Sequence, residues 1–402
     1  MVKAAILGFG TVGSGVYNVL NTNSELIKKR TGEGIEVKYV LDLREFPGHP
    51  VDDILTHDFN DIVNDPEVKV VAEVMGGIKP AYDFTKQCLL AKKSVCTSNK
   101  ELVAKHGPEL IKLAKENDVN YFFEASCGGG IPVIRSLNEA LIADEIDEIS
   151  GILNGTTNYI LTRMSREGSL FDDVLKDAQD MGYAERNPEA DIEGFDAQRK
   201  IAILSSIAFG KTVDHEKVYT EGISKITPSD IEFAKEFGCT VKLLAYSRHR
   251  DGKYHAFVAP FMVDRENPLY SVDGVFNAIF VHGNMLGDAM FYGSGAGSLP
   301  TASAVAADMA QAVKNEGRTV YNNWQEGSIE LSPIDTFEGR FFVRIEKSDK
   351  ETAKRVFGDQ TAFKEIALAG SECAFITEVM SEKDFEEKAS KLSGIKSRIR
   401  VK

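Results

Sequence analysis

The sequence feature that most constrains the fold is a glycine-rich turn set between a strand and a helix. An apolar run at residues 2–7 leads directly into GFGTVG at residues 8–13, and residues 14–20 continue as a predicted helix. In such a G-x-G-x-x-G turn the glycines permit a tight bend and a close approach of the backbone to a pyrophosphate, which lies on the helix N-terminus. An ordinary glycine-rich turn is the alternative, but the strand before it and the helix after it favour a dinucleotide site.

The strands and helices that follow extend this unit into a doubly wound sheet. Further strand patterns lie at residues 35–41, 68–75, 94–97 and 120–123, with helix patterns in the intervening segments. Strands that alternate with helices in this way predict a Rossmann domain, in which ligands gather at the carboxyl ends of the strands. Lys100 stands just after one of these strands and is therefore a candidate site residue.

Asp42 and Arg44 follow the second predicted strand and bear on the choice of cofactor. An acidic residue at this place binds the ribose hydroxyls of NAD, whereas a nearby arginine can bind the 2′-phosphate of NADP. Either residue could also be a plain surface charge. We expect NAD(H) to be accepted and keep NADP(H) open as the alternative.

Composition and charge narrow the class of function. A chain of 402 residues is long enough for two or three domains, and a net charge of -14 without a long run of lysine or arginine argues against a nucleic-acid or anionic-membrane partner. The five cysteines are scattered without a C-x-x-C pair, which is typical of reduced thiols. No leader or membrane span is predicted. We therefore expect a cytoplasmic protein that acts on a small molecule.

A buried lysine is predicted at the start of an apolar helix. Residues 201–209 are largely apolar on every face, which is typical of a helix buried all round, and Gly210 ends it. Asp196 and Lys200 enter this helix on one face, where they can form an ion pair. A solvated salt bridge is the simpler interpretation, but a lysine removed from water needs such a partner. Further carboxylates precede this pair and could bind a cationic group of a substrate, while the lysine ammonium could stabilise a developing oxyanion. This combination suits an amino-acid substrate that carries a reducible carbonyl.

A second glycine-rich turn, EASCGGGIP at residues 124–132, follows the last strand of the predicted Rossmann domain. Three glycines beside a carboxylate leave backbone carbonyls free to face one centre, which suits a hard cation. A hinge between domains explains the same spacing equally well. A third glycine-rich segment, residues 293–297, either returns to the cofactor or only caps the helix predicted at residues 301–313.

The remaining sequence predicts a mixed sheet and a C-terminal unit. Residues 149–160 place small polar side chains at a strand end, and the patterns at 241–248, 254–263 and 274–281 alternate as antiparallel strands do. Residues 339–402 have the β-α-β-β-α-β order of a ferredoxin-like unit. The predicted fold class is α/β, with a Rossmann domain, an α+β substrate and dimerisation domain, and a ferredoxin-like C-terminal domain.

Taken together, these motifs resemble those of the homoserine dehydrogenases. GFGTVG, Asn99-Lys100, EASCGGGIP, GILNGTTNYIL at residues 151–161 and the segment from GYAE to DAQRK at residues 182–200 occur in the family's order. The resemblance runs from Gly8 to about Ala307. It implies NADPH- or NADH-dependent reversible reduction of L-aspartate 4-semialdehyde to L-homoserine, on the route to threonine, methionine and isoleucine, with a bound sodium or potassium ion.

The resemblance also implies roles for individual residues. Lys200 would donate the proton, and Lys100 would bind the nicotinamide end of the cofactor or assist the chemistry. The substrate contacts would be Glu185, Asp191 and Asp196. The dinucleotide would be lined by Phe9, Thr11, Val12, Gly182 and Gly297, beside Gly8, Gly10, Gly13, Asp42 and Arg44. The cation would be held by Glu124 and backbone groups of Cys127, Gly129 and Ile131.

The same resemblance suggests the domain limits and the assembly. Residues 1–131 and 290–325 would form the dinucleotide-binding domain, residues 132–289 the substrate-binding and dimerisation domain, and residues 339–402 an ACT-like domain, in a homodimer or homotetramer. The tail has Glu346-Lys347-Ser348-Asp349-Lys350 in place of the usual Asp-x-Pro-Gly loop, so threonine regulation is predicted to be weak or absent. An open edge of the tail's sheet is expected to pair with a second subunit.

Two other functions are kept as alternatives. Cys127 could be the thiolate nucleophile of an acylating semialdehyde dehydrogenase, although no histidine base stands in a supporting motif. The chain could also be a dinucleotide-sensing regulator without catalysis, because Rossmann domains occur in non-enzymes as well. The buried Lys200 argues against a regulator.

Overall fold

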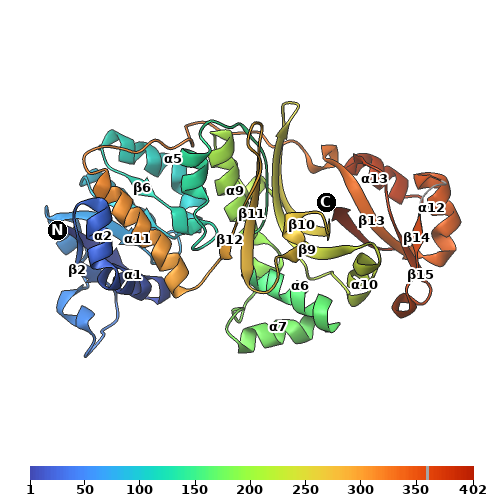
Figure 1. Cartoon of the computed structure of the whole chain (residues 1–402), viewed down its shortest axis with the longest axis horizontal. Helices are drawn as coiled ribbons and strands as arrows, with labels where there is room; N and C mark the ends of the chain where they lie inside the picture. Colours follow the sequence, from blue (N-terminus) through green and yellow to red (C-terminus); the bar gives the residue numbers. More distant parts are fainter. Residues whose placement is uncertain (359–361) are drawn as a thin grey trace. The chain divides into compact units, whose positions relative to one another are not determined.

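The computed structural model describes residues 1–358 and 362–402, which form two compact units. The first unit comprises residues 1–145, 202–215 and 291–329, and the second comprises residues 146–201, 216–290 and 330–402. Figure 1 follows the elements of each unit along the chain. Within the described residues, no helix is long and apolar enough to cross a membrane.

A parallel sheet of six strands forms the centre of the first unit. Its order, β3-β2-β1-β4-β5-β6, is that of the Rossmann fold, so the predicted Rossmann domain is confirmed. Strand β1 is buried at every residue except the partly exposed Lys3, as expected for a parallel sheet covered on both faces. The strands are β1 (Val2–Leu7), β2 (Ile35–Leu41), β3 (Leu55–Thr56), β4 (Val68–Glu73), β5 (Ser94–Thr97) and β6 (Tyr121–Phe122).

One helix of the first unit comes from much later in the chain. Helix α11 packs against α1, and Gly15 makes this approach possible, because a Cβ there would lie 2.8 Å from the Cβ of Ala302. Ala302 and Met309 join Val16 in the core of this unit. The helices of the unit include α1 (Thr11–Thr22), α2 (Ser24–Thr31), α3 (Phe59–Val63), α4 (Ala81–Leu90), α5 (Lys100–Glu116) and α11 (Ser298–Lys314).

The second unit is built on a mixed sheet, as the sequence predicted. Its main path is β12-β11-β7-β9-β10-β17-β13-β15-β14, with β8 paired to β10 and β16 paired to β13. The three predicted antiparallel strands correspond to β9, β10 and β11, and β9 and β10 pair over their full length. The strands of this unit that precede the tail are β7 (Ile146–Ile152), β8 (Tyr219–Thr220), β9 (Cys239–Arg250), β10 (Lys253–Asp264), β11 (Phe276–Gly283) and β12 (Gly287–Ser294).

Helix α9 (Phe195–Phe209) is the buried helix that the sequence predicted. Each of residues 201–207 is at most 1% exposed, and Gly210 follows the helix with a φ of 78°. Residues 195–201 of the helix belong to the second unit and the rest to the first. The other helices of the second unit before the tail are α6 (Gly155–Glu167), α7 (Phe171–Asp180), α8 (Glu189–Ile192) and α10 (Pro228–Glu236).

The C-terminal tail follows the predicted β-α-β-β-α-β order except for one additional two-residue strand, β16, before its second helix. It has a hydrophobic core of its own, which includes Phe341, Phe375 and Phe385. Its sheet is nevertheless continuous with that of the second unit, because β17 pairs in parallel with β10. Strand β17 is thus an inner strand, and the tail end of the described sheet is β14, so pairing of an open edge with a second subunit stays a prediction. The elements are β13 (Glu338–Glu346), α12 (Lys350–Phe357), β14 (Phe363–Lys364), β15 (Glu372–Ile376), β16 (Met380–Ser381), α13 (Glu382–Ala389) and β17 (Ile395–Val401).

Candidate active site

Asp196 and Lys200 form a buried ion pair at the start of α9. The Lys200 Nζ lies 2.7 Å from Oδ2 of Asp196 and donates a second hydrogen bond of 2.7 Å to the carbonyl of Leu153. Only 8% of Lys200 and 4% of Asp196 is exposed. Because an ammonium is costly to bury without a negative partner, these contacts explain how a lysine is held at this place.

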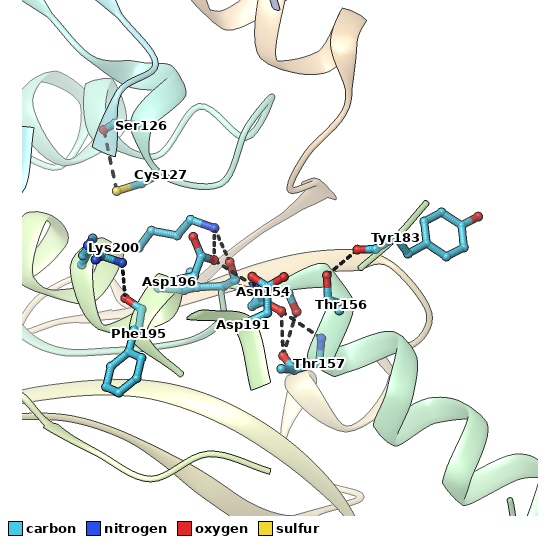
Figure 2. A network of polar contacts seen from close by, with 12 residues as sticks. Ser126, Cys127, Asn154, Thr156, Thr157, Tyr183, Asp191, Phe195, Asp196 and Lys200 are labelled. Atoms are coloured by element: carbon cyan, nitrogen blue, oxygen red, sulfur yellow. Dashed lines mark hydrogen bonds and ion pairs between the residues drawn. The ribbon is translucent and has the colours of Figure 1, made fainter. Parts of the chain in front are cut away.

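Asn154 connects this pair to Asp191. Its Nδ2 donates to Oδ1 of Asp191 at 2.7 Å and to Oδ2 of Asp196 at 2.9 Å, as Figure 2 shows. Its Oδ1 accepts from the backbone N–H of Thr157 at 2.8 Å, so Asn154 is also the N-cap of α6. Asn154 lies in the segment of small polar residues predicted at a strand end, but no individual role was predicted for it, although an asparagine between a strand and Gly-Thr-Thr is a recognisable N-cap signal. Helices α6, α8 and α9 thus bring Asn154, Asp191, Asp196 and Lys200 together; we call these four residues the lysine cluster.

Glu185 and Gly182 lie outside the lysine cluster, in the segment between α7 and α8. Glu185 is exposed, and among the described residues its side chain has no hydrogen bond or ion pair. Gly182 has a φ of 76°, so it occupies the left-handed region where glycine is favoured. The hydroxyl of Thr156 donates to the carbonyl of Tyr183 at 2.7 Å, which ties this segment to α6 (Figure 2).

The first glycine turn has the shape that a dinucleotide site requires. Gly8 has a φ of 94°, and a Cβ on Gly13 would lie 2.0 Å from the carbonyl oxygen of Gly8, so neither position has room for another residue. Gly10 is the N-cap of α1, and Thr11 and Val12 form its first turn. The free N–H groups of this helix end are the groups that bind a pyrophosphate.

Asp42 and Arg44 bind one another beside this turn. Arg44 donates from Nε and Nη2 to the two carboxylate oxygens of Asp42, each at 2.9 Å, and the N–H of Phe9 donates to the same carboxylate at 2.7 Å. Arg44 and the Phe9 amide hold the pKa of Asp42 well below its usual value. The guanidinium is largely exposed, whereas Asp42 is nearly buried. Asp42 is therefore fixed by the fold, and Arg44 is the partner that can turn away.

Lys100 begins α5 at the carboxyl end of β5, and the residues around it are fixed by a buried carboxylate. The Asn99 side chain accepts from the N–H of Leu102 at 3.1 Å and caps α5. The N–H of Asn99 donates to the hydroxyl of Thr97 at 2.9 Å, and this hydroxyl donates to Glu73 at 2.7 Å. Glu73 is fully buried, which raises its pKa. The sequence analysis missed Glu73, because it reads as the end of an apolar strand.

Gly297 lies next to the dinucleotide turn within the first unit. It is the N-cap of α11 with a φ of 112°, and the hydroxyl of the following Ser298 donates to the carbonyl of Thr11 at 2.6 Å. The glycine-rich segment before α11 therefore reaches the start of α1, rather than only capping its own helix.

The predicted cation ligands lie in the turn after β6. Gly129 has a φ of 56°, and a Cβ there would lie 2.6 Å from the carbonyl carbon of Gly295. The carboxylate of Glu124 accepts from the N–H groups of Ile134 and Arg135, each at 2.8 Å. The Glu124 side chain therefore holds the turn together, and its backbone carbonyl is the candidate ligand.

A second ion pair, between a half-buried arginine and a buried aspartate, lies behind this turn. Arg135 Nη2 is 2.5 Å from Oδ1 of Asp308, and Oδ2 of Asp308 accepts from the N–H of Glu124 at 2.9 Å. Burial, together with the charge of Glu124, raises the pKa of Asp308 to about 7. We call Glu124, Arg135 and Asp308 the turn cluster. The sequence analysis did not predict it, because Asp308 stands in an alanine-rich helix.

Two family models cover most of the chain. One, described as the NAD-binding domain of homoserine dehydrogenase, matches residues 8–124, and the other, described as homoserine dehydrogenase, matches residues 132–310. The homoserine dehydrogenase of Bacillus subtilis (strain 168) is 38% identical over 405 residues, which cover 96% of this chain and 93% of that protein. The chain belongs to the homoserine dehydrogenase family.

Solved structures of homoserine dehydrogenases agree with this assignment. The structure of a homoserine dehydrogenase from Thiobacillus denitrificans matches with a TM-score of 0.92 and 35% identity, over 100% of this chain and 98% of that one. A hyperthermophilic archaeal homoserine dehydrogenase mutant in complex with NADPH matches with a TM-score of 0.65 and 30% identity, over 77% of this chain and 97% of that one. As a member of the homoserine dehydrogenase family, the chain is an NAD(P)-dependent oxidoreductase that acts on a CH-OH group.

The two alternative functions are not supported. Cys127 is fully buried, and its sulfur accepts from the Ser126 hydroxyl at 3.8 Å, so the thiol is not presented as a nucleophile. The relatives are homoserine dehydrogenases, neither acylating dehydrogenases nor regulators.

Proposed function

We propose that the lysine cluster carries out the chemistry of the homoserine dehydrogenase reaction, the reversible reduction of L-aspartate 4-semialdehyde to L-homoserine. The observation that supports this proposal most directly is the buried Lys200 ammonium. It is hydrogen-bonded to Asp196, and Asn154 connects Asp196 to Asp191 by two further hydrogen bonds. The cluster combines a proton donor with carboxylates that suit an amino-acid substrate.

Lys200 acts on the carbonyl oxygen of the aldehyde. Bound NAD(P)H supplies the hydride that adds to the carbonyl carbon. As negative charge develops on the oxygen, the Lys200 Nζ stabilises it and transfers a proton to it, which completes the alcohol. Asp196 and the Leu153 carbonyl keep the Nζ in one place, and solvent then returns the proton to Lys200.

The carboxylates bind the amino-acid end of the substrate. Asp191 is held by Asn154 and offers a negative group to the substrate α-ammonium. Asp196 lies beside Lys200 and completes the substrate site. Glu185, on its exposed segment, adds a third carboxylate once substrate is bound.

The first unit binds the cofactor. Gly8, Gly10 and Gly13 shape the turn around the pyrophosphate, with Phe9, Thr11, Val12 and Gly297 lining it. Asp42 binds the adenine ribose of NAD(H), and Arg44 binds the 2′-phosphate of NADP(H) after it leaves Asp42. Lys100 binds the nicotinamide end, and Gly182 is a further cofactor contact.

A sodium or potassium ion fits the turn after β6. Among the described residues, no group of three or more histidine, cysteine, aspartate or glutamate side chains is placed to hold a metal. The proposed ligands are Glu124, through its backbone carbonyl, and backbone groups of Cys127, Gly129 and Ile131, because a hard cation prefers oxygen donors. The ion stabilises the turn and takes no part in proton transfer.

The assembly and the tail complete the proposal. The chain acts as a homodimer or homotetramer, and residues 339–402 are an ACT-like domain that responds weakly or not at all to threonine. The tail's own hydrophobic core supports its treatment as a third domain, beside the dinucleotide domain (1–131 and 290–325) and the substrate domain (132–289).

The experiment that tests the function follows the absorbance of NADPH or NADH after addition of L-aspartate 4-semialdehyde, with chromatography of the product. We expect cofactor oxidation and an equal amount of L-homoserine. Cofactor that binds but is not oxidised would contradict the proposal, and oxidation without homoserine would contradict the substrate assignment.

A further inference from the structure

Within the second unit, the tail and the short strand β8 meet along one edge of β10. The tail strand β17 pairs with β10 at residues 261–262, and the short strand β8 pairs with it at residues 257–258. Strand β9 occupies the opposite edge along the whole of β10. Therefore β17 and β8 lie one after the other on the same edge, although one belongs to the tail and the other precedes α10.

Arginines of β17 bind Glu221, the residue that follows β8. Oε1 of Glu221 accepts from Arg398 and Arg400, each at 3.0 Å, and from the hydroxyl of Tyr219 at 2.6 Å. Arg400 is only 2% exposed and lies over the rings of Tyr219 and Phe257. Burial alone would raise the pKa of Glu221, but Arg400 and Arg398 outweigh it and lower this pKa. Glu221 is thus a charged and fixed partner of the tail.

Glu382, at the start of α13, completes this group. Its Oε1 accepts from Nε of Arg400 at 2.5 Å and its Oε2 accepts from Arg398 at 2.9 Å. Glu382 is 5% exposed, so the two arginines are held between two carboxylates in a largely buried setting. We call Tyr219, Glu221, Glu382, Arg398 and Arg400 the tail cluster.

The residues after Glu221 support the turn that carries Asp191. The N–H of Ile223 donates to the carbonyl of Ile192 at 2.8 Å. A Cβ on Gly222 would lie 2.3 Å from the same carbonyl oxygen and 2.5 Å from the Cα of Glu193, so the two backbones are in direct contact. Ile192 is the last residue of α8 and is adjacent to Asp191.

We propose that the tail cluster positions Asp191 for substrate binding, so that Glu221, Arg398 and Arg400 are positioning residues of the homoserine dehydrogenase reaction. The proposal rests on the proposed role of Asp191. The arginines fix Glu221, and the residues after Glu221 hold the end of α8. Lys200 has separate supports in Asp196 and Leu153, so the tail acts on substrate binding more than on proton transfer.

The test compares two variants of the tail cluster with a matched control. Glu221→Gln keeps the shape of the side chain and removes its charge, and Arg400→Met removes one arginine, with Arg400→Lys as the conservative variant. The control is Arg344→Met: Arg344 is also buried, but it joins β13 to Asp230 and Thr227 of α10 and its N-cap rather than to Glu221. Full-length proteins are assayed in the homoserine-oxidising direction after folding is checked by circular dichroism.

We expect Glu221→Gln and Arg400→Met to raise the KM for homoserine by about 3- to 30-fold, while kcat and the KM for the cofactor change much less. Arg400→Lys should recover part of the affinity, and Arg344→Met should leave the KM for homoserine as in the unaltered protein. An unchanged KM in folded Glu221→Gln protein would overturn the proposal, and so would an equal rise in Arg344→Met, since any loosening of the tail would then suffice.

Asp191→Asn separates this inference from the proposed function on which it rests. If Asp191→Asn raises the KM for homoserine and Glu221→Gln does not, the positioning role fails and the substrate site stands. If Asp191→Asn has no effect on this KM, the proposed role of Asp191 fails, and with it the positioning role.

Discussion

The lysine cluster and the turn cluster are both buried ionic groups, but their partners differ. In the turn cluster, Asp308 binds Arg135 and the backbone of Glu124, and the Glu124 carboxylate binds two further backbone N–H groups. In the lysine cluster, side chains bind mainly one another: Asn154 links Asp191 to Asp196, which holds Lys200. The turn cluster thus connects segments of backbone, whereas the lysine cluster holds polar side chains together at the proposed reaction site.

This difference separates two uses of buried charge. A buried ion pair contributes little net stability against an apolar replacement, but removal of one partner is costly because the other remains unpaired. We therefore expect changes in the turn cluster to affect mainly the stability of the fold. Changes in the lysine cluster should affect mainly the reaction.

The largest expected effect is that of Lys200→Ala. Loss of the proton donor should lower kcat by about 100- to 10,000-fold, because a positioned general acid contributes a factor of this size. The dissociation constant of NADPH should change little, since the proposed role of Lys200 is in the substrate site. Steady-state kinetics and a fluorescence titration of NADPH measure the two quantities. An unchanged kcat in folded Lys200→Ala protein would show that the lysine cluster, like the turn cluster, is not needed for the reaction.

Asp308→Ala tests the other side of the comparison. The change leaves Arg135 without its buried partner and removes an acceptor from the Glu124 amide, so the free energy of unfolding should fall by about 3–5 kcal/mol. Urea denaturation of the cofactor-free protein measures this change. Asp308→Asn is the isosteric comparison: its single amide oxygen can accept only one of the two hydrogen bonds and the charge is lost, but no cavity forms, so its fall in stability should be smaller than that of Asp308→Ala. A kcat loss as large as that of Lys200→Ala at unchanged stability would instead place Asp308 in the reaction.

Lys100→Ala tests whether a charged side chain of the first unit also contributes to the reaction. If Lys100 binds the nicotinamide end, kcat/KM should fall by about 10- to 100-fold and cofactor affinity should fall with it, as expected for a lost charge-assisted hydrogen bond. Isothermal titration with NADPH measures the affinity. Equal NADPH affinity in the variant would show that Lys100 has no such contact.

Arg44→Ala gives the smallest expected effect, because this ion pair is partly exposed. The change frees the Asp42 carboxylate and removes the proposed partner of the 2′-phosphate. We expect the ratio of KM for NADPH to KM for NADH to rise by about tenfold. Arg30→Ala, a change at an exposed arginine of α2, is the control for net charge. If the ratio of the two KM values stays constant, the Asp42–Arg44 pair does not distinguish the 2′-phosphate of NADPH from the 2′-hydroxyl of NADH.

Local patterns account for the parts of the structure that the sequence could predict. Most of the Rossmann sheet was predictable because β1, β4 and β5 are each followed closely by a helix, and the glycine turn has one demanding geometry. The two-residue strand β3 was not predicted, because two residues leave no strand pattern. Helix α9 was predictable because the apolar residues after Lys200 leave no polar face. Asp196 and Lys200 were predicted together because their spacing in a helix brings them to one face.

Contacts between distant segments account for what the sequence could not predict. The partner of Asp308 lies 173 residues away, so nothing in α11 marks this aspartate as buried. The pairing of β17 with β10 involves two residue pairs, which leave no repeat in the sequence. In the sequence, Arg398 and Arg400 look like the exposed charges of an alternating strand. In the structure, ion pairs with Glu221 and Glu382 allow them to be largely buried.

The most direct test of the central claim is the single-turnover reduction of L-aspartate 4-semialdehyde by enzyme-bound NADPH in Lys200→Ala protein. This measurement isolates the chemical step from product release. If Lys200 donates the proton, the rate constant for NADPH oxidation should fall by about the same factor as kcat, at saturating substrate and with unchanged NADPH binding. A single-turnover rate equal to that of the unaltered protein would contradict the account.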